Sequence, residues 1–243
     1  MSQITDAAAP QESAVALQKI AQRHGAGYRS VGAMAYDIIR EGILDGTLPP
    51  GMKLRQETLA ELIGISRVPI RSALTQLEAD GLVEVHARRG AMVRVLSLDE
   101  AQEVYDLRIL LETQALRLSM AEMTPERIEQ LRGLAETADA ISEGGEFVTA
   151  RADFYRHLYD AERRPLTWEL IEQLRLKLGR YVLGWRLVGH DDHHESHSHL
   201  IDAVESGDVE RATRMLVSHL TRVRDGVFAL LREATGETPA RGD

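Results

Sequence analysis

The chain of 243 residues contains no cysteine. It therefore cannot form disulfides or bind a metal through thiolates, and it fits a reducing compartment. It also lacks an apolar run of roughly 18 residues, the length that a membrane-spanning helix needs. Its first residues are polar and acidic, unlike the basic and apolar start of a secretory signal. We therefore expect a soluble cytoplasmic protein with no membrane contact.

An excess of positive charge is also lacking, since the formal net charge is −9. This total does not exclude nucleic-acid binding, because the charge is unevenly distributed. Residues 1–96 carry 11 Lys+Arg and 10 Asp+Glu, which leaves 18 basic and 28 acidic residues for the rest of the chain. A nearly neutral head with clustered arginines and an acidic body fits a DNA reader whose body stays off the duplex.

The stretch 54–95 holds the most informative pattern. Apolar residues recur at helical spacing over 54–63, and Gly64 then ends this helix. Ser66 is a good N-cap for a second helix over 67–79. Two short apolar segments, 82–85 and 91–95, flank an Ala-Arg-Arg-Gly tip and predict a β hairpin. Two helices joined by a glycine turn and followed by a hairpin form a winged helix-turn-helix.

Basic and hydroxyl side chains cluster where this module would contact DNA. Ser66, Arg67 and Arg71 lie on the first turns of the second helix, away from its apolar face, where a hydroxyl can bind phosphate and an arginine can read guanine. The wing tip adds further candidates. The expected DNA-binding set is Arg55, Ser66, Arg67, Arg71, Arg88, Arg89 and Gly90. The alternatives are that these arginines form an ordinary solvated face, or that the winged helix binds protein.

The rest of the chain completes a two-domain plan. Residues 1–29 are expected to be a flexible extension, and a helix over 30–46, capped by Ser30, opens the winged domain 30–96. Ser97 and Glu100 then form a capping box at the start of an all-helical domain, 97–233, and a flexible tail covers 234–243. Six helices are expected near 98–122, 125–142, 146–162, 166–188, 192–206 and 208–233. A bundle of this kind can hold a ligand between its helices.

Histidines suggest where that ligand would bind. Asp153 and His157 are four residues apart on one helix, at or near the face that Phe154 and Leu158 would bury. In the histidine-rich run 189–200, stepping back from the apolar positions of the next helix selects His197 rather than His199. His219 lies within the apolar stripe of the last helix. These four side chains could bind zinc, with nickel or manganese as alternatives. They could equally be separate core or surface residues.

Two segments resemble known families. The run LAELIGISRVPIRSALTQLEADGLV, followed by RRGAMV, resembles the DNA-binding domain of GntR-type bacterial transcription factors. The later pattern Asp-x-x-x-His, a His before Leu-Ile-Asp-Ala-Val, Gly-Asp-x-x-x-Ala and a final His-Leu resembles the FCD effector domain of the FadR subfamily. The expected six helices, rather than seven, favour the VanR-type branch of that subfamily.

The resemblance implies a function and a set of site residues. It implies a homodimeric repressor that binds a palindromic operator and responds to a small carboxylate held on a divalent metal by Asp153, His157, His197 and His219. Arg108, with Tyr105 beside it, corresponds to an arginine that faces the cavity in this family and could bind the effector carboxylate. A surface ion pair between Arg108 and Glu112 is the alternative. A purely structural metal, with the effector bound elsewhere, is a further possibility.

The chain departs from the family pattern at two positions. Ser196 stands where the family commonly has Glu before the second ligand histidine, and Arg164 stands where it often has Asn before proline. Both departures bear on the identity of the effector. Two other functions compete with regulation: a metal-dependent hydrolase, which turnover of simple esters would reveal, and a protein-binding adaptor, whose DNA affinity would not depend on Arg67 or Arg71.

Overall fold

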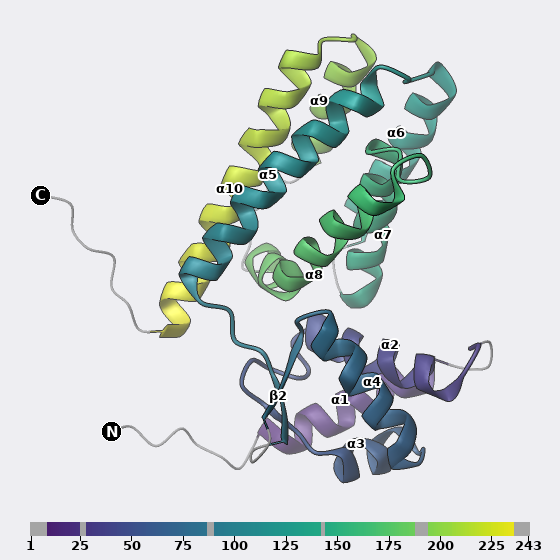
Figure 1. Ribbon diagram of the computed structural model, residues 1–243, viewed down its shortest axis with the longest axis vertical. Coiled ribbons are helices and arrows are strands. Elements are labelled where there is room, and N and C mark those ends of the chain that lie inside the picture. The colour runs from purple at the N-terminus through teal and green to yellow at the C-terminus, as the bar shows by residue number, and fades with distance from the viewer. Residues whose placement is uncertain (1–8, 25–27, 87–89, 142–143, 188–193, 236–243) are drawn as a thin grey trace, which may run out of the picture. The chain divides into compact units, whose positions relative to one another are not determined.

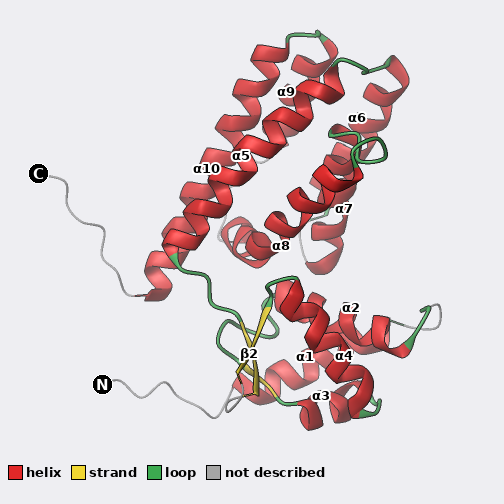
Figure 2. Cartoon of the chain, in the orientation of Figure 1, coloured by secondary structure: helices red, strands yellow, loops and turns green. Residues whose placement is uncertain are grey.

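The computed structural model describes residues 9–24, 28–86, 90–141, 144–187 and 194–235, which form ten helices and one three-stranded sheet (Figures 1 and 2). The chain divides into two compact units, Met1–Val95 and Leu96–Asp243. The expected fold class is confirmed: a mostly helical chain with a winged helix-turn-helix at its start and an all-helical bundle after it. No helix in the described ranges is long and apolar enough to cross a membrane.

The first unit contains the expected winged helix with one additional strand. Its elements are α1 (Ala9–Arg23), α2 (Val31–Leu44), β1 (Lys53–Leu54), α3 (Gln56–Ile63), α4 (Arg67–Ala79), β2 (Val83–His86) and β3 (Gly90–Val93). The antiparallel sheet has the order β1-β3-β2, with Leu54 opposite Ala91 and Val85 opposite Ala91 on the other side. Strand β1 was not expected, because two residues are too short to show a strand pattern.

Local signals in the sequence explain how these helices begin and end. The Ser30 side chain accepts a hydrogen bond from the Ala33 amide, as expected of an N-cap. Gly64 ends α3 with a φ of 79°, a left-handed conformation that glycine adopts at little cost. The apolar faces of α2, α3 and α4 then meet in one core with the sheet, which includes Ile38, Ile39, Leu59, Ile70, Leu74, Leu77, Val83 and Val93.

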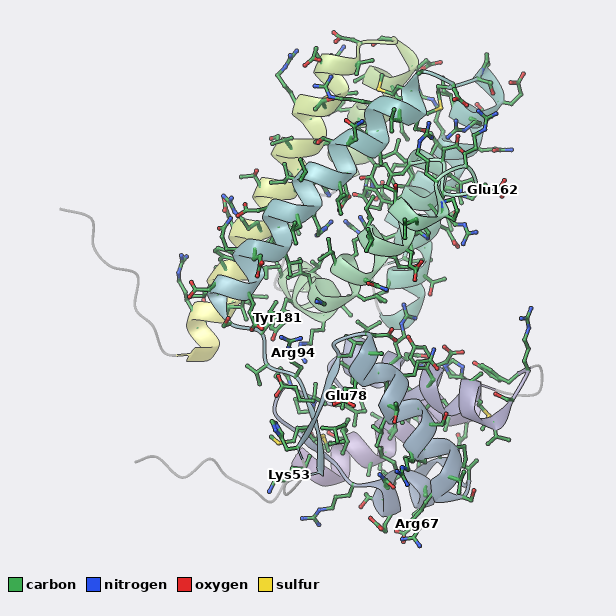
Figure 3. All side chains as sticks on the ribbon, in the orientation of Figure 1. Lys53, Arg67, Glu78, Arg94, Glu162 and Tyr181 are labelled. Carbon is green, nitrogen blue, oxygen red and sulfur yellow. The ribbon has the colours of Figure 1, made fainter. Side chains whose placement is uncertain are left out.

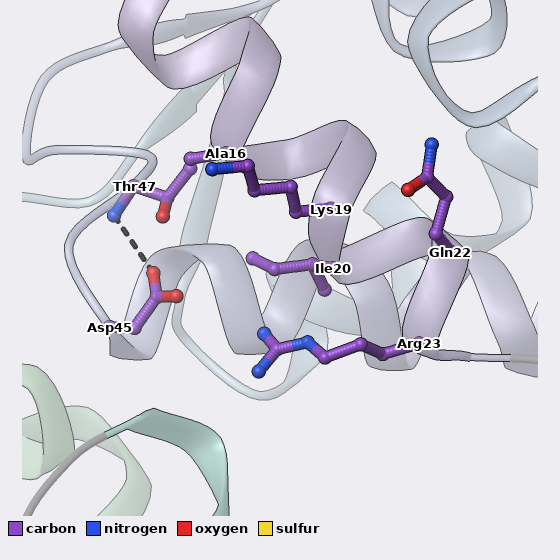
Figure 4. Close-up of a pocket in the computed structure, with 7 residues that line it drawn as sticks. All are labelled: Ala16, Lys19, Ile20, Gln22, Arg23, Asp45 and Thr47. Atoms are coloured by element: carbon purple, nitrogen blue, oxygen red, sulfur yellow. Dashed lines mark hydrogen bonds between the residues drawn. The ribbon is translucent and has the colours of Figure 1, made fainter.

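Residues 9–23 correct the prediction of a flexible N-terminal extension. They form α1, which buries Leu17 and Ile20 in the core of the winged unit. Arg23 and His24 both lie 2.6 Å from the Glu41 carboxylate on α2. A pocket of about 490 Å³ between α1 and the turn after α2 is lined by Ala16, Lys19, Ile20, Gln22, Arg23, Asp45 and Thr47 (Figure 4). The sequence showed only a weakly helical patch around Val15–Ala21, too short to predict the whole of α1. Residues 1–8 lie outside the described ranges.

The second unit consists of six helices. They are α5 (Leu98–Met120), α6 (Pro125–Ala140), α7 (Gly144–Leu158), α8 (Pro165–Leu187), α9 (His194–Glu205) and α10 (Val209–Thr235). Ser97 and Glu100 form the expected capping box at the start of α5. The long helices α5 and α10 run side by side (Figure 1). Helix α10 extends two residues into the expected tail, and 236–243 lie outside the described ranges.

The interior of the bundle contains two apolar clusters. One includes Leu116, Leu131, Phe154, Leu158, Ile171, Leu200 and Leu216, and the other includes Leu96, Val104, Leu178, Trp185, Val223 and Val227. Tyr105 belongs to the second cluster, whereas Tyr155 and Tyr159 belong to the first. Polar and charged side chains gather around these three tyrosines.

Candidate DNA-binding surface and effector site

The N-terminus of α4 presents polar and basic side chains to solvent. Ser66, Arg67 and Arg71 are all exposed, and Arg67 lies at the surface of its unit (Figure 3). Ile70 and Leu74, on the opposite face of the helix, are buried. The predicted division of α4 into a buried face and an exposed polar face is therefore observed.

These side chains make few hydrogen bonds that they would have to lose in order to bind a phosphate or a base. The Ser66 hydroxyl makes no capping hydrogen bond, although Ser66 occupies the N-cap position. Arg67 donates a 2.9 Å hydrogen bond to Glu57, but both side chains are about two-thirds exposed, at 66% and 65%. An exposed pair of this kind contributes little free energy, so Arg67 can exchange Glu57 for DNA.

The structure describes two of the four remaining residues that were expected to contact DNA. Arg55 is exposed at the N-cap position of α3. Gly90 is exposed at the start of β3 with a φ of 75°, which suits the predicted tight wing. Arg88 and Arg89 lie outside the described residues.

His197 and His219 meet in the interior of the bundle. His197 on α9 and His219 on α10 are buried, at 2% and 6% exposure, and their ring centroids are 5.7 Å apart. His199 is exposed. The helical register therefore selected the inward histidine of α9 correctly.

Helix α7 turns a different face toward the bundle interior from the one expected. The prediction that Asp153 and His157 face the bundle interior is wrong, because both side chains are exposed. Arg151, at 7% exposure, and Tyr155, at 0%, occupy the interior on the other flank of the Phe154–Leu158 stripe. This rotation buries two tyrosine rings, Tyr155 and Tyr159, and leaves an aspartate in water, where its charge is hydrated.

The Tyr155 hydroxyl lies between the two histidines, 3.2 Å from Nε2 of His197 and 3.1 Å from Nε2 of His219. Burial lowers the pKa of His197 even though Asp139 opposes this change, and burial with the Arg151 charge lowers the pKa of His219 well below its ordinary value. Both rings are therefore neutral near pH 7.

Neutral rings fix the direction of the hydrogen bonds. Nδ1 of His197 donates to the Asp139 carboxylate at 2.9 Å, so its Nε2 accepts from the Tyr155 hydroxyl. The Tyr155 oxygen then accepts from Nε2 of His219. This order leaves Nδ1 of His219 as an acceptor, and that buried atom has no hydrogen-bond partner among the described residues.

Arg108 forms the ion pair with Glu112 that was the alternative to a cavity-facing clamp. The two side chains are 2.7 Å apart, and this pair is buried rather than on the surface. Tyr159 donates a 2.6 Å hydrogen bond to Glu112, and Arg175 lies 3.4 Å from it. Burial would raise the pKa of Glu112, but Arg108, Arg175 and the Tyr159 hydrogen bond lower it below its ordinary value. Glu112 is thus an ionised carboxylate.

Two arginines and a tyrosine complete this polar centre. The Arg175 guanidinium lies 3.7 Å from the Tyr155 ring centroid, and the Arg151 guanidinium lies 5.6 Å from it. The Tyr105 ring lies 5.2 Å from the Arg108 guanidinium. Burial raises the pKa of Tyr105 to about 12, and its hydroxyl has no partner within the described part of the chain. We call Tyr105, Arg108, Glu112, Asp139, Arg151, Tyr155, Tyr159, Arg175, His197 and His219 the polar centre.

Six members of the polar centre were not anticipated as site residues: Glu112, Asp139, Arg151, Tyr155, Tyr159 and Arg175. The spacing Arg151-x-x-x-Tyr155 was as visible in the sequence as Asp153-x-x-x-His157. The aromatic pair Tyr155 and Tyr159, one turn apart, was the signal that could have identified the buried flank. Nothing in the sequence around Asp139 or Arg175 distinguishes them from solvated charges.

The described residues do not form a ligand set that fits the expected divalent metal. Within the described ranges, no group of three or more His, Asp or Glu side chains is placed to hold a metal ion. The two imidazoles that do approach each other are bridged by a phenol, which is a poor ligand for zinc at neutral pH because it must first lose its proton.

Comparisons with known proteins agree with both units. Residues 32–93 match "Bacterial regulatory proteins, gntR family", and residues 103–222 match "FCD domain". The "Probable D-xylose utilization operon transcriptional repressor" of Paenarthrobacter nicotinovorans is 30% identical over 195 residues, which are 79% of this chain and 86% of that protein.

Two further relatives extend over most of the chain. The "Uncharacterized HTH-type transcriptional regulator BphR" of Paraburkholderia xenovorans is 30% identical over 223 residues, covering 85% of this chain and 90% of that protein. The structure of Escherichia coli McbR/YncC superposes with a TM-score of 0.68 at 23% identity, covering 86% of this chain and all of that one, and so supports the fold. Because the curated relatives are transcriptional regulators and not enzymes, and both matched segments lie where the structure places a winged helix and a helical bundle, this chain belongs to the GntR family of DNA-binding regulators and carries an FCD domain.

Proposed function

We propose that this chain is a cytoplasmic repressor that binds a palindromic operator as a homodimer and loses affinity for it when a small organic acid binds the helical unit. The observation that carries the proposal is the pairing, in one chain, of an exposed basic recognition helix with a buried polar centre that still has unpartnered atoms. A ligand that binds one of two conformations more tightly shifts the balance between them, and so changes DNA affinity.

Repression is supported by relatives of the chain. The relative in Paenarthrobacter nicotinovorans carries "transcriptional repressor" in its name, and so does RspR of Escherichia coli, which is 23% identical over 208 residues. The organic acid is supported by the arginines of the polar centre, because a guanidinium binds a carboxylate through two parallel hydrogen bonds.

A homodimer is supported by leucines that the bundle leaves in water. Leu107, Leu110 and Leu118 are 42%, 65% and 41% exposed on α5. Arg164 donates a hydrogen bond to the Leu118 carbonyl, so the start of α8, with Leu166 68% exposed, lies beside the end of α5. Exposed leucines on adjacent helices are typical of a protein-binding surface. We assign this surface to self-association.

We assign no role in effector binding to the metal that the resemblance implies. The described residues bring His197 and His219 together with Tyr155 rather than with Asp153 and His157. We therefore assign effector binding to the protein groups of the polar centre.

The test begins with duplexes that the wild-type protein selects from a random DNA library. Arg67→Ala and Arg71→Ala should each weaken binding to the selected duplex by about 1–3 kcal/mol if the arginine contacts a base. A phosphate contact should also reduce the salt dependence of the affinity by about one unit of slope. Arg211→Ala, an exposed arginine on α10, is the matched control and should bind as the wild type does.

The selected duplex also serves to test the homodimer. Sedimentation should give two chains per selected duplex, and Leu110→Glu should reduce this ratio. Wild-type affinity in both recognition-helix variants would contradict the DNA-binding assignment of α4 and favour a protein-binding adaptor. Selected sequences without inverted symmetry, bound by one chain, would contradict the homodimer.

A further inference from the structure

The most exposed large apolar side chain among the described residues lies on the helix that carries the expected DNA contacts. Val68, the second residue of α4, is 78% exposed, compared with 68% for Leu166 on α8. A single exposed valine needs no explanation on an ordinary protein surface. Val68, however, directly follows Arg67, at the end of α4 that a recognition helix directs at base edges. Its position therefore bears on how α4 reads DNA.

Helical geometry places Val68 on the same exposed face as the two arginines of α4. Successive residues of an α-helix are rotated by about 100°, so Arg71 lies about 40° from Arg67 and Val68 about 60° beyond Arg71. All three side chains are exposed. Ile70 and Leu77, which are buried, lie about 160° and about 180° from Val68. A base edge that meets Arg71 is therefore beside Val68 as well.

Valine contributes little to the winged unit at this position. An exposed side chain gains little from burial, and a β-branched residue forms helices less readily than alanine does. The core residues of α4 lie on its other face and are Ile70, Ala73, Leu74 and Leu77. Packing within the unit therefore does not account for Val68.

Thymine carries the apolar group that a valine can contact in the major groove. The base edges there present hydrogen-bond donors and acceptors, and thymine adds its C5 methyl group. The Val68 side chain has no donor or acceptor, so it cannot bind a phosphate or a polar base edge. Contact with the thymine methyl removes apolar surface of both groups from water, which is favourable. The chemistry of Val68 thus complements thymine, as that of the neighbouring Arg71 complements guanine.

We propose that Val68 is a specificity-determining residue that packs against the C5 methyl group of one thymine in each half-site, next to the base that Arg71 reads. The contact distinguishes thymine from cytosine, which has no methyl group at this position. This inference rests on the proposed function, in which α4 binds an operator. It goes further because it names a base that α4 reads without a hydrogen bond.

The test removes one methyl group at a time from the selected duplex. Each thymine is replaced in turn by deoxyuridine, which keeps the base pair and lacks only the C5 methyl, and affinity is measured by fluorescence anisotropy. One thymine in each half-site should respond to this replacement. There, the wild-type protein should bind about threefold to fivefold more weakly, the effect expected for one buried methyl-sized group.

A double-mutant cycle assigns the responsive thymine to Val68. Val68→Ala shortens the side chain and should bind thymine and deoxyuridine duplexes with equal affinity. Val31→Ala is the matched control, because it removes a 51% exposed valine from α2 of the same unit, and it should keep the wild-type difference. Neither valine belongs to the core of the unit, so thermal melts by circular dichroism should show both variants folded as the wild type is.

A second arm adds a methyl group instead of removing one. Cytosine or 5-methylcytosine, each paired with guanine, replaces thymine at the responsive position. The wild type should bind the methylated duplex about threefold to fivefold more tightly than the unmethylated one, and Val68→Ala should bind the two equally. Because methylation leaves the hydrogen-bonding groups of cytosine unchanged, this comparison separates a methyl contact from a hydrogen bond to the base.

Three outcomes would overturn the inference. They are a wild-type affinity that no deoxyuridine replacement weakens, a deoxyuridine effect in Val68→Ala equal to that in the wild type, and a wild-type affinity that cytosine methylation leaves unchanged. In each case Arg67→Ala and Arg71→Ala would still weaken binding, and the proposed function would stand. Wild-type affinity in both arginine variants would instead contradict the proposed function, because α4 would then not be the element that reads DNA.

Discussion

Glu112 interacts with three other side chains of the polar centre. It binds Arg108 at 2.7 Å and Tyr159 at 2.6 Å, and Arg175 lies 3.4 Å away. Its carboxylate is fully buried, so removing its charge would leave Arg108 in the interior without compensation. Breaking a buried ion pair in this way typically costs about 3–5 kcal/mol.

Glu112→Gln should therefore lower the free energy of unfolding of the bundle by about 3–5 kcal/mol at pH 7. The pKa of Glu112 is lower in the folded chain than its ordinary value of 4.5, so its contribution is complete above that value and is lost as the pH falls through the lower, folded value. The gap between wild type and variant should narrow below pH 4.5. Urea unfolding at several pH values measures it.

Glu129→Gln, an exposed residue on α6, serves as the control and should unfold as the wild type does. A gap between wild type and Glu112→Gln that stays constant down to pH 3 would show that the Glu112 charge is not what stabilises the centre.

Tyr155 shows why part of the site could not be predicted from sequence. Two pairs on α7 have the same spacing of four, and only one of them can face the interior. The choice depends on the aromatic area that Tyr155 and Tyr159 bury, which is greater than what Asp153 and His157 could offer. Spacing alone correctly identified His197 and His219 as buried, because His197 lies one turn before Leu200 and Ile201 and His219 lies within the apolar stripe of α10.

At the scale of elements, α10 and α8 meet at a glycine. A Cβ at Gly226 on α10 would overlap the indole ring of Trp185 on α8. Gly133, within α6, has no neighbouring atom within 4 Å of such a Cβ. Alanine favours a helix interior over glycine by about 1 kcal/mol. Substituting each glycine by alanine therefore distinguishes the effect of a close helix–helix contact from the effect of helix propensity.

Gly226→Ala should destabilise the bundle by about 1–3 kcal/mol, because the new methyl group forces the Trp185 ring to move. Gly133→Ala should stabilise it by about 0.5–1 kcal/mol. Thermal melts of both variants beside the wild type measure the two effects. Stabilisation by both substitutions would contradict the close approach of α8 and α10.

Helices were predicted correctly where their own residues carried a clear apolar pattern. Helix α4 matches its expected range, 67–79, and the six bundle helices differ from expectation by at most four residues at an end. Helix α1 gave only a weak signal, because Leu17 and Ile20 are its two buried apolar residues in the core of the winged unit. Strand β1 was missed because it is formed by pairing with β3 rather than by its own pattern.

At the scale of the whole molecule, the two units differ in how far apart in the sequence their candidate site residues lie. The expected DNA-binding residues of the winged helix all lie within residues 55–90, so this one segment was enough to predict them. The polar centre gathers side chains from Tyr105 to His219 on six helices. Its composition depends on how the helices are rotated against one another, which no single segment determines.

The central claim is that an organic acid bound by protein groups of the polar centre controls DNA binding. The most direct measurement is the affinity of EDTA-treated protein for its selected duplex, by fluorescence anisotropy, with and without each member of a panel of small organic acids. At least one of these acids should weaken wild-type binding by about tenfold or more and leave Arg151→Gln unchanged. No effect on the wild type, or an effect that appears only with added divalent metal, would contradict the account.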